Sequence, residues 1–132
     1  MAGFLTHMSI FFGSILLGYL FWNWKYGLSF GIGHLAPDLL DFGVIGIIEA
    51  SLKPTIIIRN QLFRPLMIFG HTFTNSIILA AVLLAIVFIL FKLKKISKEK
   101  ATIAAIIIIM FTLGILSHII ADELIIETNH WI

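Results

Sequence analysis

The stretch ATIAAIIIIMFTLGILSHIIADEL, Ala101 to Leu124, decides how this chain is interpreted. Its first part is apolar enough for a membrane helix, which needs about 20 such residues. Its last part nevertheless carries His118 and Asp122, and residues four positions apart lie on one face of a helix. An ionisable side chain at the centre of a membrane helix costs roughly 2.5–3.5 kcal/mol on insertion scales, so it usually faces the protein interior and pairs with or coordinates another group.

The composition of the whole chain indicates a membrane protein with a single transmembrane domain, residues 1–132. Of its 132 residues, 60% are hydrophobic and 12% are charged, whereas a soluble domain has about half and about a quarter. The mean hydropathy is +1.08. The absence of cysteine excludes disulfides, cysteine-based zinc sites and a thiol nucleophile. The net charge of +2 and the single basic run give no reason to expect nucleic acid as a partner.

Three segments have the length and apolar character of full membrane spans: Thr6–Trp24, Thr72–Phe91, and Ala101 to about Ile126. A fourth segment, residues 26–50, is apolar but rich in glycine, and we expect it to break near Pro37 as a re-entrant helix. The sequence therefore predicts an all-α, polytopic helical bundle with three full spans and one broken or re-entrant segment. An amphipathic segment around residues 51–70 is expected to lie at the interface.

The distribution of basic residues predicts the orientation in an inner (cell) membrane. Lys25 and the loop 92–100 contain six lysines on one side, against three basic residues on the other, which favours a cytoplasmic location for that loop. This topology places the ionisable residues of four segments in the same, non-cytoplasmic half of the membrane. They are His7, His34, Asp38, Asp41, His71, His118 and Asp122.

Such a set of histidines and aspartates favours a divalent metal, zinc first, with manganese or iron as alternatives. His118 and Asp122 can hold one ion together, and Asp38 and Asp41 can do the same if the chain is helical after Pro37. The structural alternative is a network in which these side chains only hydrogen-bond one another. His34 fits both interpretations.

Four sequence blocks resemble a known family. GFLTHMSIFFG, GHLAPDLLDF, FGHTFTNSIIL and GILSHIIADEL occur in this order between Gly3 and Leu124. Together they are similar to the motifs of the LexA-binding, inner-membrane-associated metal-dependent hydrolases, which are small multi-pass membrane proteins. The last block is close to the family form.

The resemblance implies a set of metal ligands and supporting residues. The ligands are His7, Asp38, His71, His118 and Asp122, and the supporting residues are His34, Thr74 and Asn75. The chain also departs from the pattern. Asp41 is displaced by one residue from the family's second aspartate. Phe42 and Asn75 stand where the family has histidines.

The resemblance implies a metal-dependent hydrolase. From the metal chemistry and the arginines at the same interface, we expect it to act on an ester or phosphoester, with a lipid-like substrate at the non-cytoplasmic half of the membrane. The metal would activate a water molecule, and Asp38 or Asp41 would be the general base. Arg59 and Arg64 would bind an anionic group of the substrate.

Two other interpretations remain open at this point. The chain can be a non-catalytic membrane subunit whose polar cluster is structural. A proton or ion pathway would need polar residues in both halves of the membrane, and the cytoplasmic half is almost purely apolar. The bilayer is the expected surrounding, and the glycine-rich stretch Gly27–Gly33 also allows a homo-oligomer or a membrane complex.

Overall fold

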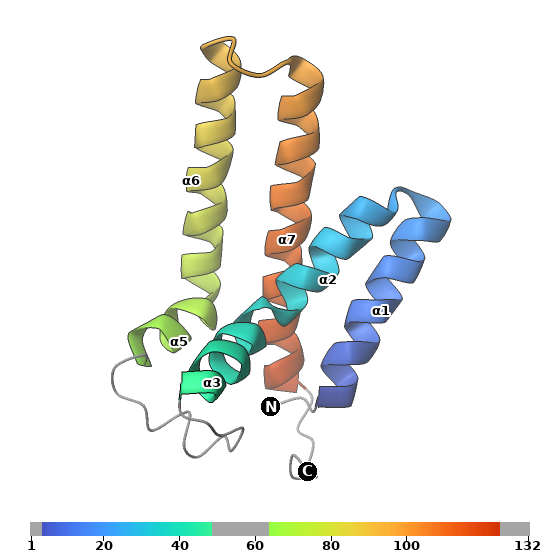
Figure 1. The fold of residues 1–132 in the computed structure, drawn as a ribbon, viewed down its shortest axis with the longest axis vertical. Helices are drawn as coiled ribbons and strands as arrows, with labels where there is room; N and C mark the ends of the chain where they lie inside the picture. Colours follow the sequence, from blue (N-terminus) through green and yellow to red (C-terminus); the bar gives the residue numbers. More distant parts are fainter. Residues whose placement is uncertain (1–3, 49–63, 125–132) are drawn as a thin grey trace.

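The computed structural model describes residues 4–48 and 64–124, and within these ranges the chain is helical without any strand. This confirms the all-α class. The elements, coloured along the chain in Figure 1, are α1 (Phe4–Phe21), α2 (Trp24–Asp38), η1 (Leu39–Ile45), α3 (Gly46–Ile48), α5 (Arg64–Gly70), α6 (Phe73–Lys92) and α7 (Lys98–Leu124).

The helices α6 and α7 form an antiparallel hairpin. They have 20 and 27 residues, and a helix of about 20 residues spans roughly the 30 Å of a bilayer's hydrocarbon core. By length and composition, these two of the described helices suffice to cross a membrane. The apolar helix at the N-terminus is shorter, so the expected third full span is not shown.

The turn between α6 and α7 is shorter than the loop expected from the sequence, because Lys92 ends α6 and Lys98 already begins α7. Lys94 adopts a left-handed conformation with φ of 55°. The amides of Lys94 and Lys95 donate to the carbonyls of Phe91 and Leu90, both at 2.9 Å. This pair of bonds is a Schellman motif, which satisfies carbonyls at the end of α6.

The described part of the molecule has a polar interior and an apolar surface. Its buried hydrophobic residues are only Ile115, Ile119 and Ala121, whereas large apolar side chains such as Ile78 and Phe88 are more than half exposed. In a water-soluble protein we would expect the reverse. This distribution matches a chain whose helices face lipid.

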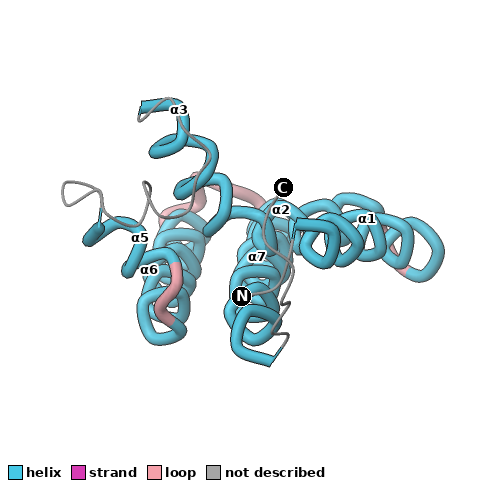
Figure 2. The backbone as a smooth tube through the Cα atoms, turned by 90° about the horizontal axis from the view of Figure 1, so that it is seen from below, coloured by secondary structure: helices cyan, strands magenta, loops and turns pink. Residues whose placement is uncertain are grey.

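Helix α2 positions the other helices, because it packs against both α1 and α7. Figures 1 and 2 place α7 between α6 and α1, with α2 crossing α7. The crossing with α7 depends on two glycines. A Cβ atom on Gly33 would collide with the carbonyl of Phe111, and one on Gly114 would collide with the carbonyl of Phe30. Small residues of this kind permit close helix packing in membranes.

Hydrogen bonds reinforce the contacts of α2 with both neighbours. Ser29 donates to the carbonyl of Ile107 on α7 at 2.9 Å, and Ser14 of α1 donates to the carbonyl of Gly27 at 3.1 Å. These bonds fix α2 between the two helices in an apolar surrounding.

The expected break near Pro37 has a different form in the structure. Pro37 lies inside α2, which ends one residue later at Asp38, and the chain continues as the π-helical segment η1. Proline lacks an N–H group and cannot donate a helical hydrogen bond. The α-helical pattern nevertheless continues past it, because the amide of Leu39 donates to the carbonyl of Leu35, and the π-helical segment begins only at Leu39. Such π-helical turns occur frequently at functional sites.

Candidate metal centre

Four separate elements bring ionisable side chains together at the end of the molecule opposite the α6–α7 turn. The start of α1, the end of α2, the turn before α6 and the end of α7 meet there. These elements provide His7, His34, Asp38, His71, His118 and Asp122. The structure thus gathers six of the seven residues that the topology places in one half of the membrane.

Three imidazoles of this cluster, those of His7, His34 and His118, are the most buried large side chains of the described residues, and His71 is half-buried. His7 is 1% exposed, and His34 and His118 are 0% exposed. The side chains of Asp38 and Asp122 are 16% and 13% exposed, so the carboxylates form the accessible edge of the cluster. Burial of polar groups at this depth is costly unless each of them gains a partner.

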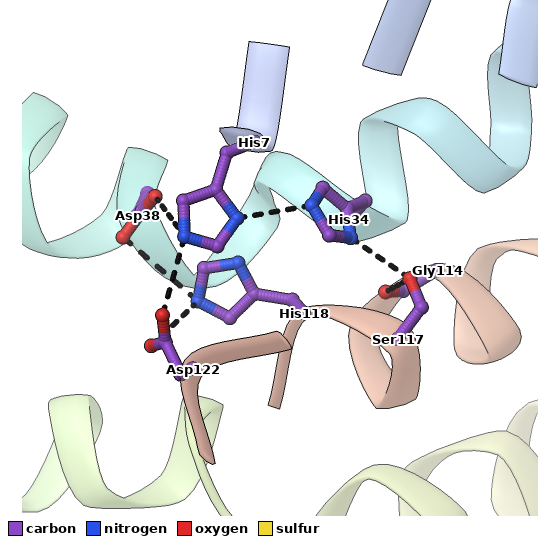
Figure 3. A network of polar contacts seen from close by, with 7 residues as sticks. All are labelled: His7, His34, Asp38, Gly114, Ser117, His118 and Asp122. Atoms are coloured by element: carbon purple, nitrogen blue, oxygen red, sulfur yellow. Dashed lines mark hydrogen bonds and ion pairs between the residues drawn. The ribbon is translucent and has the colours of Figure 1, made fainter. Parts of the chain in front are cut away.

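Two imidazoles face two carboxylates across a short gap (Figure 3). The Nε2 atom of His7 lies 3.2 Å from Oδ1 of Asp122 and 3.9 Å from Oδ2 of Asp38. The Nε2 atom of His118 lies 3.5 Å from Oδ2 of Asp122 and 3.9 Å from Oδ1 of Asp38. All four groups therefore direct possible ligand atoms into the same space.

These distances fit ligands around a cation, and the 3.2 Å contact between His7 and Asp122 is also a hydrogen bond. In a tetrahedral site with bonds of about 2.0–2.1 Å, neighbouring ligand atoms lie roughly 3.3 Å apart. Within the described part of the chain, the two buried ring nitrogens of His118 form no hydrogen bond. A buried imidazole without one is unusual, and a metal ion would supply the partner that its Nε2 lone pair needs.

A hydrogen-bond chain fixes the orientation and the tautomer of His7. Ser117 donates its hydroxyl hydrogen to the carbonyl of Gly114 at 2.7 Å, so its oxygen accepts from Nδ1 of His34 at 2.8 Å. The Nε2 atom of a neutral His34 then accepts from Nδ1 of His7 at 3.0 Å. In this neutral form His7 presents the lone pair of its Nε2 atom to the carboxylates, which is the form that binds a metal. In the protonated form the same Nε2 atom donates to Oδ1 of Asp122 at 3.2 Å.

His71 approaches the cluster from the turn between α5 and α6. Its ring centroid lies 5.3 Å from that of His118. Potential ligand atoms of Asp38, His71 and His118 lie within 4.8 Å of one another, and so do those of His7, His34 and His118. His118 therefore belongs to both groups of possible ligands.

The expected supporting residues have different outcomes. His34 is fully integrated into the cluster. Thr74 and Asn75 lie in the first turn of α6, with Thr74 exposed, and neither forms a hydrogen bond with the described cluster residues. The predicted support from Thr74 and Asn75 stays a prediction.

Three predicted site residues lie wholly or partly outside the described residues. The backbone of Asp41 belongs to η1 and that of Arg64 begins α5, but their side chains are not described. Arg59 lies in the range 49–63 and is outside the description altogether. Their expected roles as general base and anion-binding residues remain predictions.

Sequence reasoning missed Ser117, which holds His34 in place. The signal was present, because a small hydroxyl residue directly precedes His118 in an otherwise apolar helix. The serine alone does not indicate a role, because its contact with His34 depends on the close approach of α2 and α7 at Gly33 and Gly114. The helix crossing, rather than any local motif, gives Ser117 its role.

No family model, curated protein or solved structure matches this chain. The helical architecture, the apolar surface and the geometry of the cluster are therefore the evidence for function. They describe a helical protein whose histidine and aspartate cluster can hold a metal ion.

Proposed function

We propose that the chain is a multi-pass membrane protein that binds a divalent metal, with zinc as the first candidate, and hydrolyses an ester or phosphoester. One observation carries the proposal. The Nε2 atoms of His7 and His118 face the carboxylates of Asp38 and Asp122 at 3.2–3.9 Å, as ligands of a cation would. Histidine nitrogens with carboxylate oxygens are typical zinc ligands in catalytic sites.

The proposed membrane arrangement has α1, α6 and α7 as spans and α2 with η1 as a re-entrant segment. The apolar surface of the helices supports it. The basic residues near the α6–α7 turn would face the cytoplasm of a cell with an inner membrane, and the cluster would lie in the opposite half. Re-entrant backbone is tolerated at that depth where it is covered by protein, and α2 is covered by α1 and α7.

When bound, a divalent ion supplies the Lewis acidity that makes a water molecule nucleophilic near neutral pH. His7 and His118 would be metal ligands. His34 and Ser117 would keep His7 in the required tautomer. The partly exposed carboxylate of Asp38 is placed to accept a proton at the accessible edge of the cluster. The buried imidazoles exclude bulk water from the inner side.

The resemblance to the inner-membrane metal-dependent hydrolases supports the same function. The five metal ligands that the resemblance implies all lie in the cluster. They are His7, Asp38, His71, His118 and Asp122. His34 provides an additional imidazole in a chain that lacks two of the family's histidines. A lipid-like substrate fits a centre surrounded by apolar helix surface, and Arg59 and Arg64 remain the proposed contacts for its anionic group.

A non-catalytic membrane subunit with a structural metal is the second candidate. The complete burial of His34 and His118 favours it, because structural zinc sites are closed to solvent. The two candidates differ in one measurable property. A catalytic centre exchanges a metal-bound water with the solvent, whereas a closed structural centre does not.

The test uses the full chain purified in detergent without chelators. We expect stoichiometric metal by mass spectrometry and hydrolysis of p-nitrophenyl phosphate or a p-nitrophenyl acyl ester that stops when His118 is replaced by alanine. The matched control, Ser76→Ala, removes a buried hydroxyl of α6 that donates to the carbonyl of Thr72, and it should keep both properties. Absence of metal from the wild-type protein would refute the proposal. Metal without hydrolysis or water exchange would favour the structural subunit.

A further inference from the structure

Each carboxylate of the cluster contacts the two imidazoles with different oxygen atoms. Asp122 directs Oδ1 toward His7 and Oδ2 toward His118. Asp38 directs Oδ2 toward His7 and Oδ1 toward His118. A carboxylate that binds one ion needs one oxygen or a chelating pair facing a single point. Two carboxylates that each divide their oxygens between the same two histidines have the arrangement of bridging ligands (Figure 3).

The two imidazole rings are oriented for separate ions. The rings of His7 and His118 are stacked, with centroids 4.4 Å apart and an interplanar angle of 25°. An imidazole binds a metal in its ring plane, along the lone pair of the nitrogen. Stacked and nearly parallel rings direct their lone pairs to two neighbouring points, whereas two ligands of one tetrahedral ion would converge. In two-metal hydrolytic sites the ions are about 3.5–4 Å apart, close to this ring spacing.

The remaining histidines are distributed between these two points. His71 forms a compact group with Asp38 and His118, whereas His34 hydrogen-bonds His7 on the other side of the cluster. An ion bound by the Nε2 atom of His118 would thus have the imidazole of His71 as a second possible ligand. An ion bound by His7 would have an imidazole ligand whose tautomer is set by His34 and Ser117.

We propose that this centre holds two divalent ions, one bound by His7 and the other by His118 and His71, with Asp38 and Asp122 bridging them. The inference rests on the proposed metal centre and specifies the number of ions and the assignment of ligands. It also narrows the substrate class. Two carboxylates neutralise only half of the charge of two divalent ions, so the site favours a phosphoester, whose anionic oxygens would contact both ions.

The first experiment counts metal in the wild-type chain. The protein is purified in detergent, loaded with Mn²⁺, freed of unbound metal and measured by mass spectrometry against protein concentration from amino-acid analysis. Two ions for each chain support the proposal. One ion overturns it but leaves the proposed metal centre standing. No bound ion overturns both.

Electron paramagnetic resonance of the same wild-type sample provides a second measurement that does not depend on any variant. Two Mn²⁺ ions bridged by carboxylates give a spin-coupled spectrum, and we expect to observe it. A spectrum of isolated ions only would overturn the bridged arrangement.

Variants then test the assignment of ligands. His7→Ala and His71→Ala should each retain one ion and lose the coupled spectrum, while Ser76→Ala, whose hydroxyl donates to the carbonyl of Thr72, should retain two coupled ions. If His7→Ala keeps two coupled ions, or if His71→Ala does, the assignment is wrong. Hydrolysis of a phosphodiester should exceed that of a matched carboxylic ester in the two-ion protein, and the opposite preference would contradict the inferred substrate class.

Discussion

Helices α6 and α7 have the same mean hydropathy of 2.6 over their most apolar windows, yet they have different roles in the molecule. The only buried residue of α6 is Ser76, and the rest of the helix faces outward or is half-buried. In contrast, α7 buries one face, from Gly114 to Ala121, against α2. Hydropathy therefore identifies helices that can span a bilayer, but it does not distinguish a lipid-facing helix from one that forms a site.

The difference arises from a few residues near the end of α7. Gly114 allows the backbone of α2 to approach, and this contact places His34 beside Ser117 and His118. The small residue Ala81, near the centre of α6, is instead exposed. Enlarging the small residue on each helix, at Gly114 and at Ala81, tests whether the close contact at the glycine, rather than the apolar character of the helix, creates the site.

The largest effect is expected from Gly114→Leu. The Cβ atom alone would collide with the carbonyl of Phe30 and would lie 2.7 Å from the backbone nitrogen of His34, so α2 must move away. Overpacking costs roughly 1–3 kcal/mol and occasionally more, and rigid backbone on both sides places this variant at or above the upper end. We expect a large loss of thermal stability in detergent and loss of metal binding. Ala81→Leu on α6 is the control and should change neither, and an equal response of both variants would show that the glycine contact is not decisive.

The second prediction concerns the polar residues that are buried on the two helices. His118→Ala should weaken metal binding by more than the roughly 10–100-fold loss typical of outer-shell changes, because it removes a ligand shared by both groups of three. Ser76→Ala should leave metal affinity unchanged, because Ser76 donates only to the carbonyl of Thr72 at 3.2 Å within its own segment. Competition titration with a metal indicator measures both affinities. If Ser76→Ala lowers the metal affinity as much as His118→Ala does, the loss of any buried polar side chain would explain the lower affinity.

A smaller effect is expected from Ser117→Ala, which removes the acceptor for Nδ1 of His34. Without it, His34 can adopt the other tautomer, and His7 no longer presents its Nε2 lone pair consistently. We expect a loss of metal affinity of roughly 10–100-fold with the helical content preserved. Thr112→Ala on the same helix is the control, since Thr112 bonds only to the carbonyl of Ile108 at 2.8 Å. A Ser117→Ala protein with unchanged affinity would exclude this positioning role.

Sequence alone predicted the helical class and one long helix almost to the residue, with Thr72–Phe91 expected and Phe73–Lys92 observed. It also placed the histidines and aspartates at one end, because the predicted alternation of helix directions decides which helix ends lie together. Local hydropathy could not give the start of α7 at Lys98, since a basic helix start resembles a loop. The π-helical continuation after Asp38 could not be predicted either, because a proline in the sequence predicts a break but not the form that the backbone takes beyond it.

The detailed chemistry of the centre required three-dimensional contacts. The link from Ser117 to His34 joins residues 83 positions apart and depends on the crossing of α2 and α7. The division of each carboxylate between His7 and His118 likewise depends on how α1 and α7 are placed by α2. Spacing within one helix identified His118 and Asp122 as partners, but it could not show that the oxygens of Asp122 face two different imidazoles.

The smallest effect is expected at the opposite end of the hairpin, in the turn between α6 and α7. Lys94 has a φ of 55°, a conformation that costs a residue with a Cβ atom roughly 1–2 kcal/mol relative to glycine. Lys94→Gly should therefore raise the stability of the hairpin by about 1 kcal/mol, measured by thermal unfolding in detergent, without any change in metal affinity. Lys95→Gly is the matched control, because it removes the same charge from a residue without this conformation, and it should not stabilise the protein. If Lys94→Gly altered metal affinity, the turn at the start of α7 and the metal centre at its end would be energetically coupled. The two ends of α7 could then not be treated as independent.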